Sequence, residues 1–391
     1  MGLTGCASAA VGVDPPHAAV FDSLLEQAVA EGATGVGLYV SQPGHPAYLA
    51  GRGLAHVERL EPLTGAHLFR IASMTKPYLS ALLVKLEVEG ELSLEDPITQ
   101  HLPDSLLALI PHAEQITIYD LLTHWSGISD YRDLVFSMDV LFEHPHAVRD
   151  EYTDLTDGLR RNPTPCAAPH LPPEQLTEAL ASCLDSNSNY VLAGYIVDHV
   201  LYGVEPQPGV RPQHHSRAFR EQLFAPLGLE HTYYEKHLLM GEDPYPLLAH
   251  GYFTLPNRDG TVDADAPKTD VTDLDDGYGH ANGALLASLA DVAKFRRAVL
   301  DDDQVFPMRN LQDKQRFLAR YTQLNPLGVA PSGSYADGRW HMTGDLGGYT
   351  SRAEYDPVSD TIVVLYSNDR DFEPQRDALV ARIQAVIAGE R

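Results

Sequence analysis

The chain has 391 residues, of which 44% are hydrophobic and 21% charged, a composition typical of a globular protein with one large core or two smaller ones. Its 54 acidic residues outnumber its 28 basic residues, and the resulting net charge of -26 disfavours binding to nucleic acid or to an anionic membrane surface. Because no run approaches the roughly 18 apolar residues of a membrane-spanning helix, we expect none.

The first residues carry neither the basic nor the apolar region of a secretory signal peptide. The segment 3–6 nevertheless resembles the end of a bacterial lipoprotein signal. Such a signal would make Cys6 a lipid anchor and place the protein in the cell envelope or periplasm, whereas the alternative is a cytoplasmic protein. The other cysteines, Cys166 and Cys183, lack the spacing of metal ligands, and a disulfide between them stays an open alternative.

The two ends of the chain have similar patterns. An amphipathic segment at 18–30 predicts a helix, and the β-rich runs 35–40 and 47–50 predict a hairpin after it. Near the other end, two strand-like runs at 349–355 and 361–366 are followed by a helical pattern. This similarity predicts that both ends contribute to one antiparallel sheet.

Between these ends the pattern is mostly helical, as in the apolar spacing from Leu79 to Leu86. The sequence therefore predicts an α+β fold in two parts. A discontinuous sheet domain would comprise 1–75 and 275–391, and a mainly helical domain would be inserted at 76–274.

Ser73 follows an apolar run and stands where the helix that ends near Gly90 would begin. Lys76 lies three residues later, on the same face of that helix, so its amine would lie beside the Ser73 hydroxyl. Serine becomes a strong nucleophile when a neighbouring base removes its proton, and a lysine with a lowered pKa can serve as that base. The alternative is a serine that only caps a helix, followed by an exposed lysine.

The residues Ser73-Met74-Thr75-Lys76 resemble the Ser-x-x-Lys signature of the β-lactamase and penicillin-binding DD-peptidase superfamily. Further matches follow in the family's order, at 90–98, 121–128, 226–229, 249–252 and 283–288. They are most similar to the branch with class C β-lactamases, DD-carboxypeptidases, esterases and D-amino-acid peptidases. The resemblance implies a β-lactamase/transpeptidase-like fold, with Ser73 as the acylated nucleophile and Lys76 as its proton partner. It also implies an oxyanion hole formed by the backbone N–H groups of Ser73 and Asp345.

The family's second motif, Tyr-x-Asn, matches Asp185-Ser186-Asn187, so an aspartate stands at the tyrosine position. Asp185 could replace the phenol as a base beside Lys76, could cap the following helix, or could mark a broken site. Asn187 would position the substrate. Tyr190 matches a core tyrosine of the family rather than a substitute phenol.

The third motif, Lys-Thr-Gly or His-x-Gly on a strand, matches the region of Met342, Thr343 and Gly344. Met342 takes the cationic position, and His341 stands one residue early, so it would reach the site only through a bulge. Thr343 and Gly344 fit the motif without adjustment and would bind substrate.

The expected function is hydrolysis of an ester or amide through an acyl-enzyme on Ser73. The substrate would be a small molecule or a peptide, such as a β-lactam, a D-amino-acid peptide or a carboxylic ester. The sequence contains no motif for a metal or cofactor, so we expect neither. The competing hypothesis is a catalytically impaired homologue with a binding or regulatory role, because the second and third motifs are altered. The sequence does not specify the oligomeric state.

Overall fold

The computed structural model describes residues 15–147, 149–165, 168–170, 185–210, 214–235, 247–263, 265–274, 279–300, 306, 308–324 and 334–389. Cys6, Cys166 and Cys183 lie outside the described residues, and so do the lipid anchor and the disulfide considered for them. In the described part of the chain, none of the helices has the length and apolar character needed to cross a bilayer.

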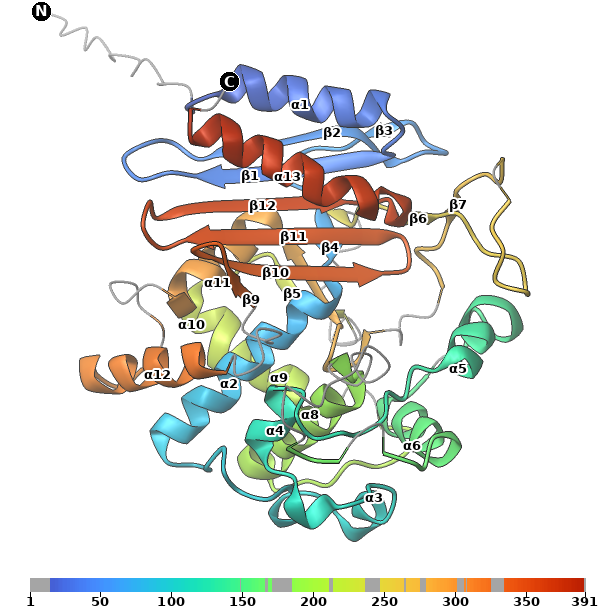
Figure 1. The fold of residues 1–391 in the computed structure, drawn as a ribbon, viewed down its shortest axis with the longest axis vertical. Helices are drawn as coiled ribbons and strands as arrows, with labels where there is room; N and C mark the ends of the chain where they lie inside the picture. The colour runs from blue at the N-terminus through green and yellow to red at the C-terminus, as the bar shows by residue number, and fades with distance from the viewer. Residues whose placement is uncertain are drawn as a thin grey trace, which may run out of the picture.

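A seven-stranded antiparallel sheet dominates the fold, with the strand order β3-β2-β1-β12-β11-β10-β9 (Figure 1). Its strands are β1 (Gly35–Ser41), β2 (Tyr48–His56), β3 (Glu61–Pro62), β9 (Ser334–Ala336), β10 (Arg339–Leu346), β11 (Tyr349–Asp356) and β12 (Thr361–Ser367). β1 pairs with β12 along almost its whole length, from Val36 opposite Ser367 to Ser41 opposite Ile362. The two ends of the chain therefore form one sheet, as the sequence predicts.

Helices cover both faces of this sheet. α1 (Ala18–Ala30) and α13 (Glu373–Ile387) lie side by side on one face, where Phe21 and Ile383 pack against alternate residues of the central strands (Figure 1). α11 (Leu289–Leu300) lies on the other face, against β1 and β12. Every residue of β12 is buried, as expected for a central strand covered on both sides.

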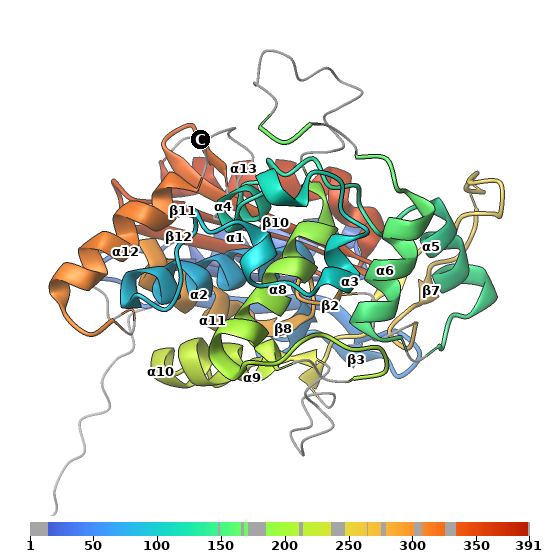
Figure 2. The same cartoon turned by 90° about the horizontal axis from the view of Figure 1, so that it is seen from below.

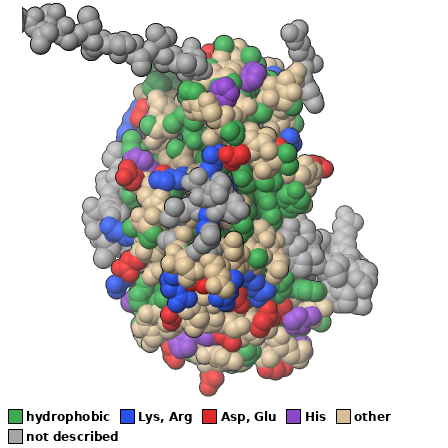
Figure 3. All heavy atoms as spheres, turned by 90° about the vertical axis from the view of Figure 1, so that its left-hand side faces the viewer, with side chains coloured by type: hydrophobic (Ala, Val, Ile, Leu, Met, Phe, Trp, Pro, Cys, Tyr) green, Lys and Arg blue, Asp and Glu red, His purple; other side chains and the backbone are tan. Residues whose placement is uncertain are grey.

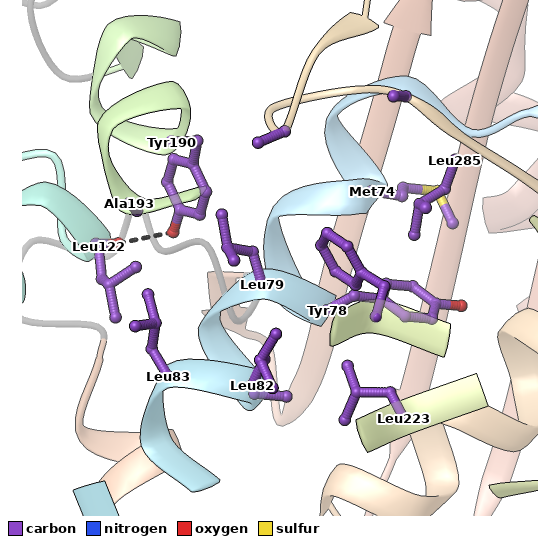
Figure 4. Packing of buried hydrophobic residues seen from close by; sticks show 14 of the residues in the cluster. Met74, Tyr78, Leu79, Leu82, Leu83, Leu122, Tyr190, Ala193, Leu223 and Leu285 are labelled. Carbon is purple, nitrogen blue, oxygen red and sulfur yellow. Dashed lines mark hydrogen bonds between the residues drawn. The ribbon is translucent and has the colours of Figure 1, made fainter. Parts of the chain in front are cut away.

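The lower half of the molecule is mostly helical (Figures 1 and 2). Its helices include α2 (Lys76–Glu89), α3 (Asp104–Leu107), α4 (Ile118–Leu122), α5 (Leu134–Met138), α6 (Glu151–Arg161), α8 (Asn187–Tyr202), α9 (His215–Phe219), α10 (Ala225–Leu227) and α12 (Leu311–Gln323). α2 is the central helix, and its side chains Leu79 and Leu83 point toward Tyr190 and Leu122 (Figure 4). The mixed architecture confirms the predicted α+β fold class.

The described residues also form two smaller sheets. β4 (Leu68–Arg70), β8 (Leu285–Ser288) and β5 (Thr232–Tyr234) form one, and β6 (Tyr252–Phe253) and β7 (Thr269–Asp270) form the other. β5 pairs with β8 although they lie on opposite sides of the predicted boundary at residue 275. The domain boundaries in the sequence stay predictions.

Charged side chains of both signs are distributed over the surface. On the face shown in Figure 3, acidic side chains lie among and beside a band of basic ones. On that face the negative charge is therefore not concentrated in a single region.

Candidate active site

Ser73 lies in a tight turn between β4 and α2. The residues Ala72–Thr75 form a 3-10 turn, and the α-helix begins only at Lys76, three residues later than the sequence pattern indicates. Ala72 has a φ of 50°, a left-handed conformation that is unfavourable for a residue with a Cβ atom. Two hydrogen bonds with the backbone of Leu285 hold the turn. The Ile71 N–H donates to the Leu285 carbonyl (2.9 Å), and the Leu285 N–H donates to the Thr75 hydroxyl (3.2 Å). Backbone strain that the surrounding contacts hold in place is common at functional sites.

Lys76 lies directly beside Ser73. Its Nζ atom is 2.8 Å from Ser73 Oγ and 3.0 Å from Asn187 Oδ1. Lys76 is 3% exposed, whereas Ser73 is partly open to solvent. Burial lowers the pKa of Lys76, and the nearby carboxylates of Asp185 and Asp130 only partly oppose this shift. The nucleophile is therefore accessible, and its neighbouring amine is easier to deprotonate than an ordinary lysine.

Asp185 places a carboxylate next to this amine. Its Oδ1 atom is 3.7 Å from Lys76 Nζ, which is within ion-pair range but too long for a hydrogen bond. The Asp185 side chain is 67% exposed, so it also faces the solvent. The predicted alternative of a helix cap is wrong, because the residue at the N-cap position of α8 is Ser186.

His124 lies on the other side of Asp185, and a chain of hydrogen bonds fixes its tautomer. Ser126 Oγ accepts from the Ile128 N–H (3.1 Å) and donates to Asn189 Oδ1 (2.6 Å). The Asn189 amide then donates to His124 Nδ1 (3.2 Å), so the ring proton is on Nε2, 3.5 Å from Asp185. Burial lowers the pKa of His124 to about 4, and the ring is neutral near pH 7.

Asn187 connects several parts of the site through its amide. Its Oδ1 atom accepts from both Lys76 and Asn282 (3.0 Å each), and its Nδ2 atom donates to Asp130 (2.7 Å). Burial raises the pKa of Asp130 in spite of this hydrogen bond. Sequence reasoning identified Asn187 but missed Asp130, Asn282 and His124. His124 and Asn282 lie in or beside segments that match the family, although no role was assigned to them.

β10 brings the third motif against the turn of Ser73. A Cβ atom at Gly344 would lie 2.0 Å from the carbonyl oxygen of Ile71, so only glycine allows this close approach. The side chain of Asp345 turns away and accepts hydrogen bonds from Arg376 (3.0 Å) and Thr350 (2.6 Å). The carboxylate of Asp345 is thus engaged away from the turn, and the oxyanion-hole role of its backbone N–H stays a prediction.

The structure does not bring His341 into the site, and this prediction is corrected. The β10–β11 register is regular from Trp340 to Leu346, so no bulge turns the ring. His341 Nδ1 lies 3.0 Å from Glu354, and its Nε2 donates to the Ala336 carbonyl (3.0 Å). Thr343 shares this face of the strand and is exposed, whereas Met342 is buried in the core.

Tyr190 belongs to the core. Its side chain is fully buried, and its hydroxyl donates to the Leu122 carbonyl at 2.9 Å (Figure 4). The same hydroxyl lies 3.0 Å from Ser80 Oγ. The phenol is thus engaged inside the helical half, as expected for the family's core tyrosine.

A hollow open to solvent lies at the end of β10, and its empty space, part of which is open solvent, is about 530 Å³. Leu346 and Gly347 line it on one side, and Arg70, three residues before Ser73, lines it on another. Its other lining residues are mainly apolar: Val140, Leu141, Phe253, Val271 and Leu274, with Glu235 and Gly279. The Arg70 guanidinium is paired with the Glu235 carboxylate through hydrogen bonds of 2.7 and 3.0 Å.

Comparison with solved structures supports the same fold. The D-amino acid amidase of Ochrobactrum anthropi SV3, complexed with L-phenylalanine amide, is 25% identical with a TM-score of 0.67, and the match covers 90% of this chain and 91% of that one. The octameric penicillin-binding protein homologue of Pyrococcus abyssi is 21% identical with a TM-score of 0.69, over 95% of this chain and 78% of that one.

The curated proteins that resemble this chain include an esterase and a putative penicillin-binding protein. Esterase EstB of Burkholderia gladioli is 38% identical over 28% of this chain, and the putative penicillin-binding protein PbpX of Bacillus subtilis is 24% identical over 80%. The chain spans 28% and 64% of their lengths, less than two thirds in each case. The family model described as Beta-lactamase matches residues 21–387. The chain therefore belongs to the β-lactamase family of serine hydrolases.

Proposed function

We propose that the protein hydrolyses an ester or amide through an acyl-enzyme on Ser73. The observation that carries this proposal is the 2.8 Å contact between Ser73 Oγ and the buried Nζ of Lys76. A neutral Lys76 can donate an N–H to Asn187 Oδ1, at 3.0 Å, which leaves its nitrogen lone pair for the Ser73 proton. The lowered pKa of Lys76 increases the fraction of this neutral form.

In each half of the reaction Lys76 takes up one proton and releases it again. Ser73 Oγ bonds to the substrate carbonyl carbon while its proton moves to Lys76 Nζ. The bond from that carbon to the alcohol or amine breaks, and the leaving group takes the proton from Lys76. A water molecule next gives a proton to Lys76 and attacks the acyl carbon, and Ser73 leaves with that proton. Lys76 thus acts as base and acid in both halves of the reaction.

Asp185 would stabilise the ammonium form of Lys76 that each half of the reaction creates. The 3.7 Å separation suits an ion pair, and the His124 Nε2–H lies 3.5 Å from the same carboxylate oxygen. An opposite charge at this distance favours the protonated lysine. We therefore favour a functional replacement of the family's tyrosine over a broken site.

The negative charge that develops on the substrate oxygen would be stabilised by the backbone N–H groups of Ser73 and Asp345. Gly344 supports this assignment, because its contact with the Ile71 carbonyl holds β10 against the turn. Thr343 is exposed but lies on the same face of the strand as His341 and Asp345, so no contact with bound substrate is assigned to it.

The substrate we propose is an ester or amide without a free carboxylate next to the reacting bond. Met342, at the position that carries a cation in the family's third motif, is 4% exposed and apolar. The exposed carboxylate of Asp185 would also repel an anionic substrate. The names of the relatives, an esterase and a D-amino acid amidase, agree with this class.

Intact-mass measurement after incubation with a fluorophosphonate tests the nucleophile. We expect one adduct on Ser73 that Ser73→Ala abolishes, while Ser80→Ala, on the same segment, keeps it. Parallel incubation with benzylpenicillin and with p-nitrophenyl acetate tests the substrate class, and the neutral ester should be turned over faster. Labelling that is absent in the folded wild-type protein would sink the proposal and support the impaired homologue.

A further inference from the structure

Three side chains that commonly bind metals lie together, and none of them contributes to the site around Ser73. His56 ends β2, His250 precedes β6, and Asp270 ends β7. One ligand atom from each lies within 4.8 Å of those of the other two. The backbone keeps these segments together, because His250 N–H donates to the Ala55 carbonyl (2.8 Å) and Tyr252 pairs with Asp270.

The His56 ring has an unsatisfied nitrogen. Its Nδ1 atom lies 3.0 Å from a carboxylate oxygen of Glu58. The geometry of this contact is not that of a hydrogen bond, so the buried Nδ1 atom has no hydrogen-bond partner among the described residues. The ring stacks on that of His250, with centroids 3.9 Å apart. A buried ring nitrogen without a hydrogen bond is unusual in a folded protein and suits a ligand that the side chains alone do not supply.

His250 is already oriented by a carboxylate. Its Nδ1 atom lies 2.6 Å from Asp270 Oδ2, and the other oxygen of Asp270 accepts from the Thr272 N–H (2.9 Å). The side chains of His250 and Asp270 are 28% and 27% exposed, so an ion can reach them from solvent. With Nδ1 engaged by Asp270, Nε2 is the ring nitrogen of His250 that can bind an ion.

Glu58 adds a second carboxylate at the edge of the cluster. It accepts a hydrogen bond from the Tyr252 hydroxyl (2.8 Å), and its side chain is 57% exposed and has room to turn. Imidazoles bind metal ions in their neutral form, so with two carboxylates the occupied site would balance the charge of a divalent cation. This combination of nitrogen and oxygen ligands is one that zinc accepts in four-coordinate sites.

We propose that His56, His250 and Asp270 form a binding site for a divalent transition metal of the zinc class, with Glu58 as the fourth ligand. Ligands at about 2.1 Å from zinc in a tetrahedral site lie about 3.4 Å from one another, so the ligand atoms would have to approach one another by side-chain rotation from their spacing of up to 4.8 Å. The ion would tie the end of β2 to the β6–β7 hairpin. The site does not depend on the hydrolase proposal, since it shares no residue with it.

Calorimetric titration of the chelator-treated protein with Zn²⁺ tests this site. We expect one equivalent to bind, with about tenfold or greater loss of affinity in His56→Asn and in His250→Asn. Zn²⁺ should also raise the thermal unfolding midpoint of the wild type more than that of either variant. The absorption spectrum with Co²⁺ should lack the thiolate bands that binding by cysteine would give.

His199→Asn is the matched control. His199 and His101 also form a pair, with Nδ1 atoms 3.4 Å apart, and Asp96 lies 3.3 Å from His101. This variant should bind Zn²⁺ like the wild type. Circular dichroism and fluorophosphonate labelling of all three variants check that they are folded. The proposal is overturned if the wild type binds no Zn²⁺, or if His56→Asn and His250→Asn bind it with unchanged affinity.

Discussion

The turn of Ser73 and strand β10 touch each other, yet they contribute different kinds of groups to the site. In the turn the chemistry lies in side chains, because Ser73 and Lys76 point toward the same space at 2.8 Å. In β10 the side chain of Asp345 faces α13, and Gly344 has no side chain, so the strand offers mainly its backbone. Substitutions in the turn should therefore affect chemistry, whereas those in β10 should affect geometry or stability.

The largest effect should come from Lys76→Ala. Without the amine no described side chain takes the Ser73 proton at 2.8 Å, and the rate of acylation should fall by about 1,000-fold or more, about 4 kcal/mol of activation free energy. Stopped-flow kinetics with a chromogenic ester would measure it. Lys85→Ala, on the same helix and paired with Glu89, should keep nearly full activity. Equal losses in both variants would contradict the assigned role.

Gly344→Ala should separate geometry from chemistry. The new Cβ atom would meet the Ile71 carbonyl at 2.0 Å, and since both groups are constrained backbone, we expect a loss of about 3 kcal/mol in the free energy of unfolding. Gly347→Ala is the matched control, because nothing lies within 4 Å of its Cβ position. It should change stability by less than about 0.5 kcal/mol in denaturant titrations. A tolerated Gly344→Ala would show that β10 can move away from the turn.

His124 should make the stability of the site depend on pH. Burial lowers its pKa from 6.5 to about 4, so between these values the unfolded chain binds a proton that the folded protein does not. The free energy of unfolding should fall as the pH drops through this window, by up to about 3 kcal/mol, with no contribution from His124 above it. Urea titrations from pH 7.5 to 4 would give the slope. The same slope in His124→Gln would assign the effect to other groups.

Asp185→Asn tests the ion pair beside Lys76. Loss of the carboxylate removes the charge that stabilises the ammonium, and kcat/KM should fall by about 100-fold. Because that charge raises the pKa of Lys76, the basic form should appear at lower pH in the variant, and the rise of activity with pH should shift downward. Asp185→Glu should restore much of the rate. An unchanged pH profile and rate would assign Asp185 to the solvated surface.

The parts of the site that depend on local spacing could be predicted from the sequence, whereas those that depend on the packing of distant segments could not. Residues three apart share a face both in an α-helix and in the 3-10 turn that holds Ser73, so the pairing of Ser73 with Lys76 could be predicted locally. The contacts of Asn187 with Asp130 and Asn282 could not, because they join residues 57 and 95 positions apart through the packing of separate segments. The terminal sheet was predictable because period-two hydrophobicity marks each strand, although its register depends on pairing across the whole chain.

His341→Gln should have the smallest effect and tests the orientation of β10. His341 and Arg352 hold Glu354, and although burial alone would raise the pKa of Glu354, these contacts lower it to about 2. Loss of the ring should cost about 1 kcal/mol of stability, because the Ala336 carbonyl and the Arg352 guanidinium each lose a hydrogen-bond partner. Activity should stay within about twofold, since the ring faces away from Ser73. A large drop in kcat with unchanged stability would mean that the strand turns during the reaction and that His341 meets the substrate after all.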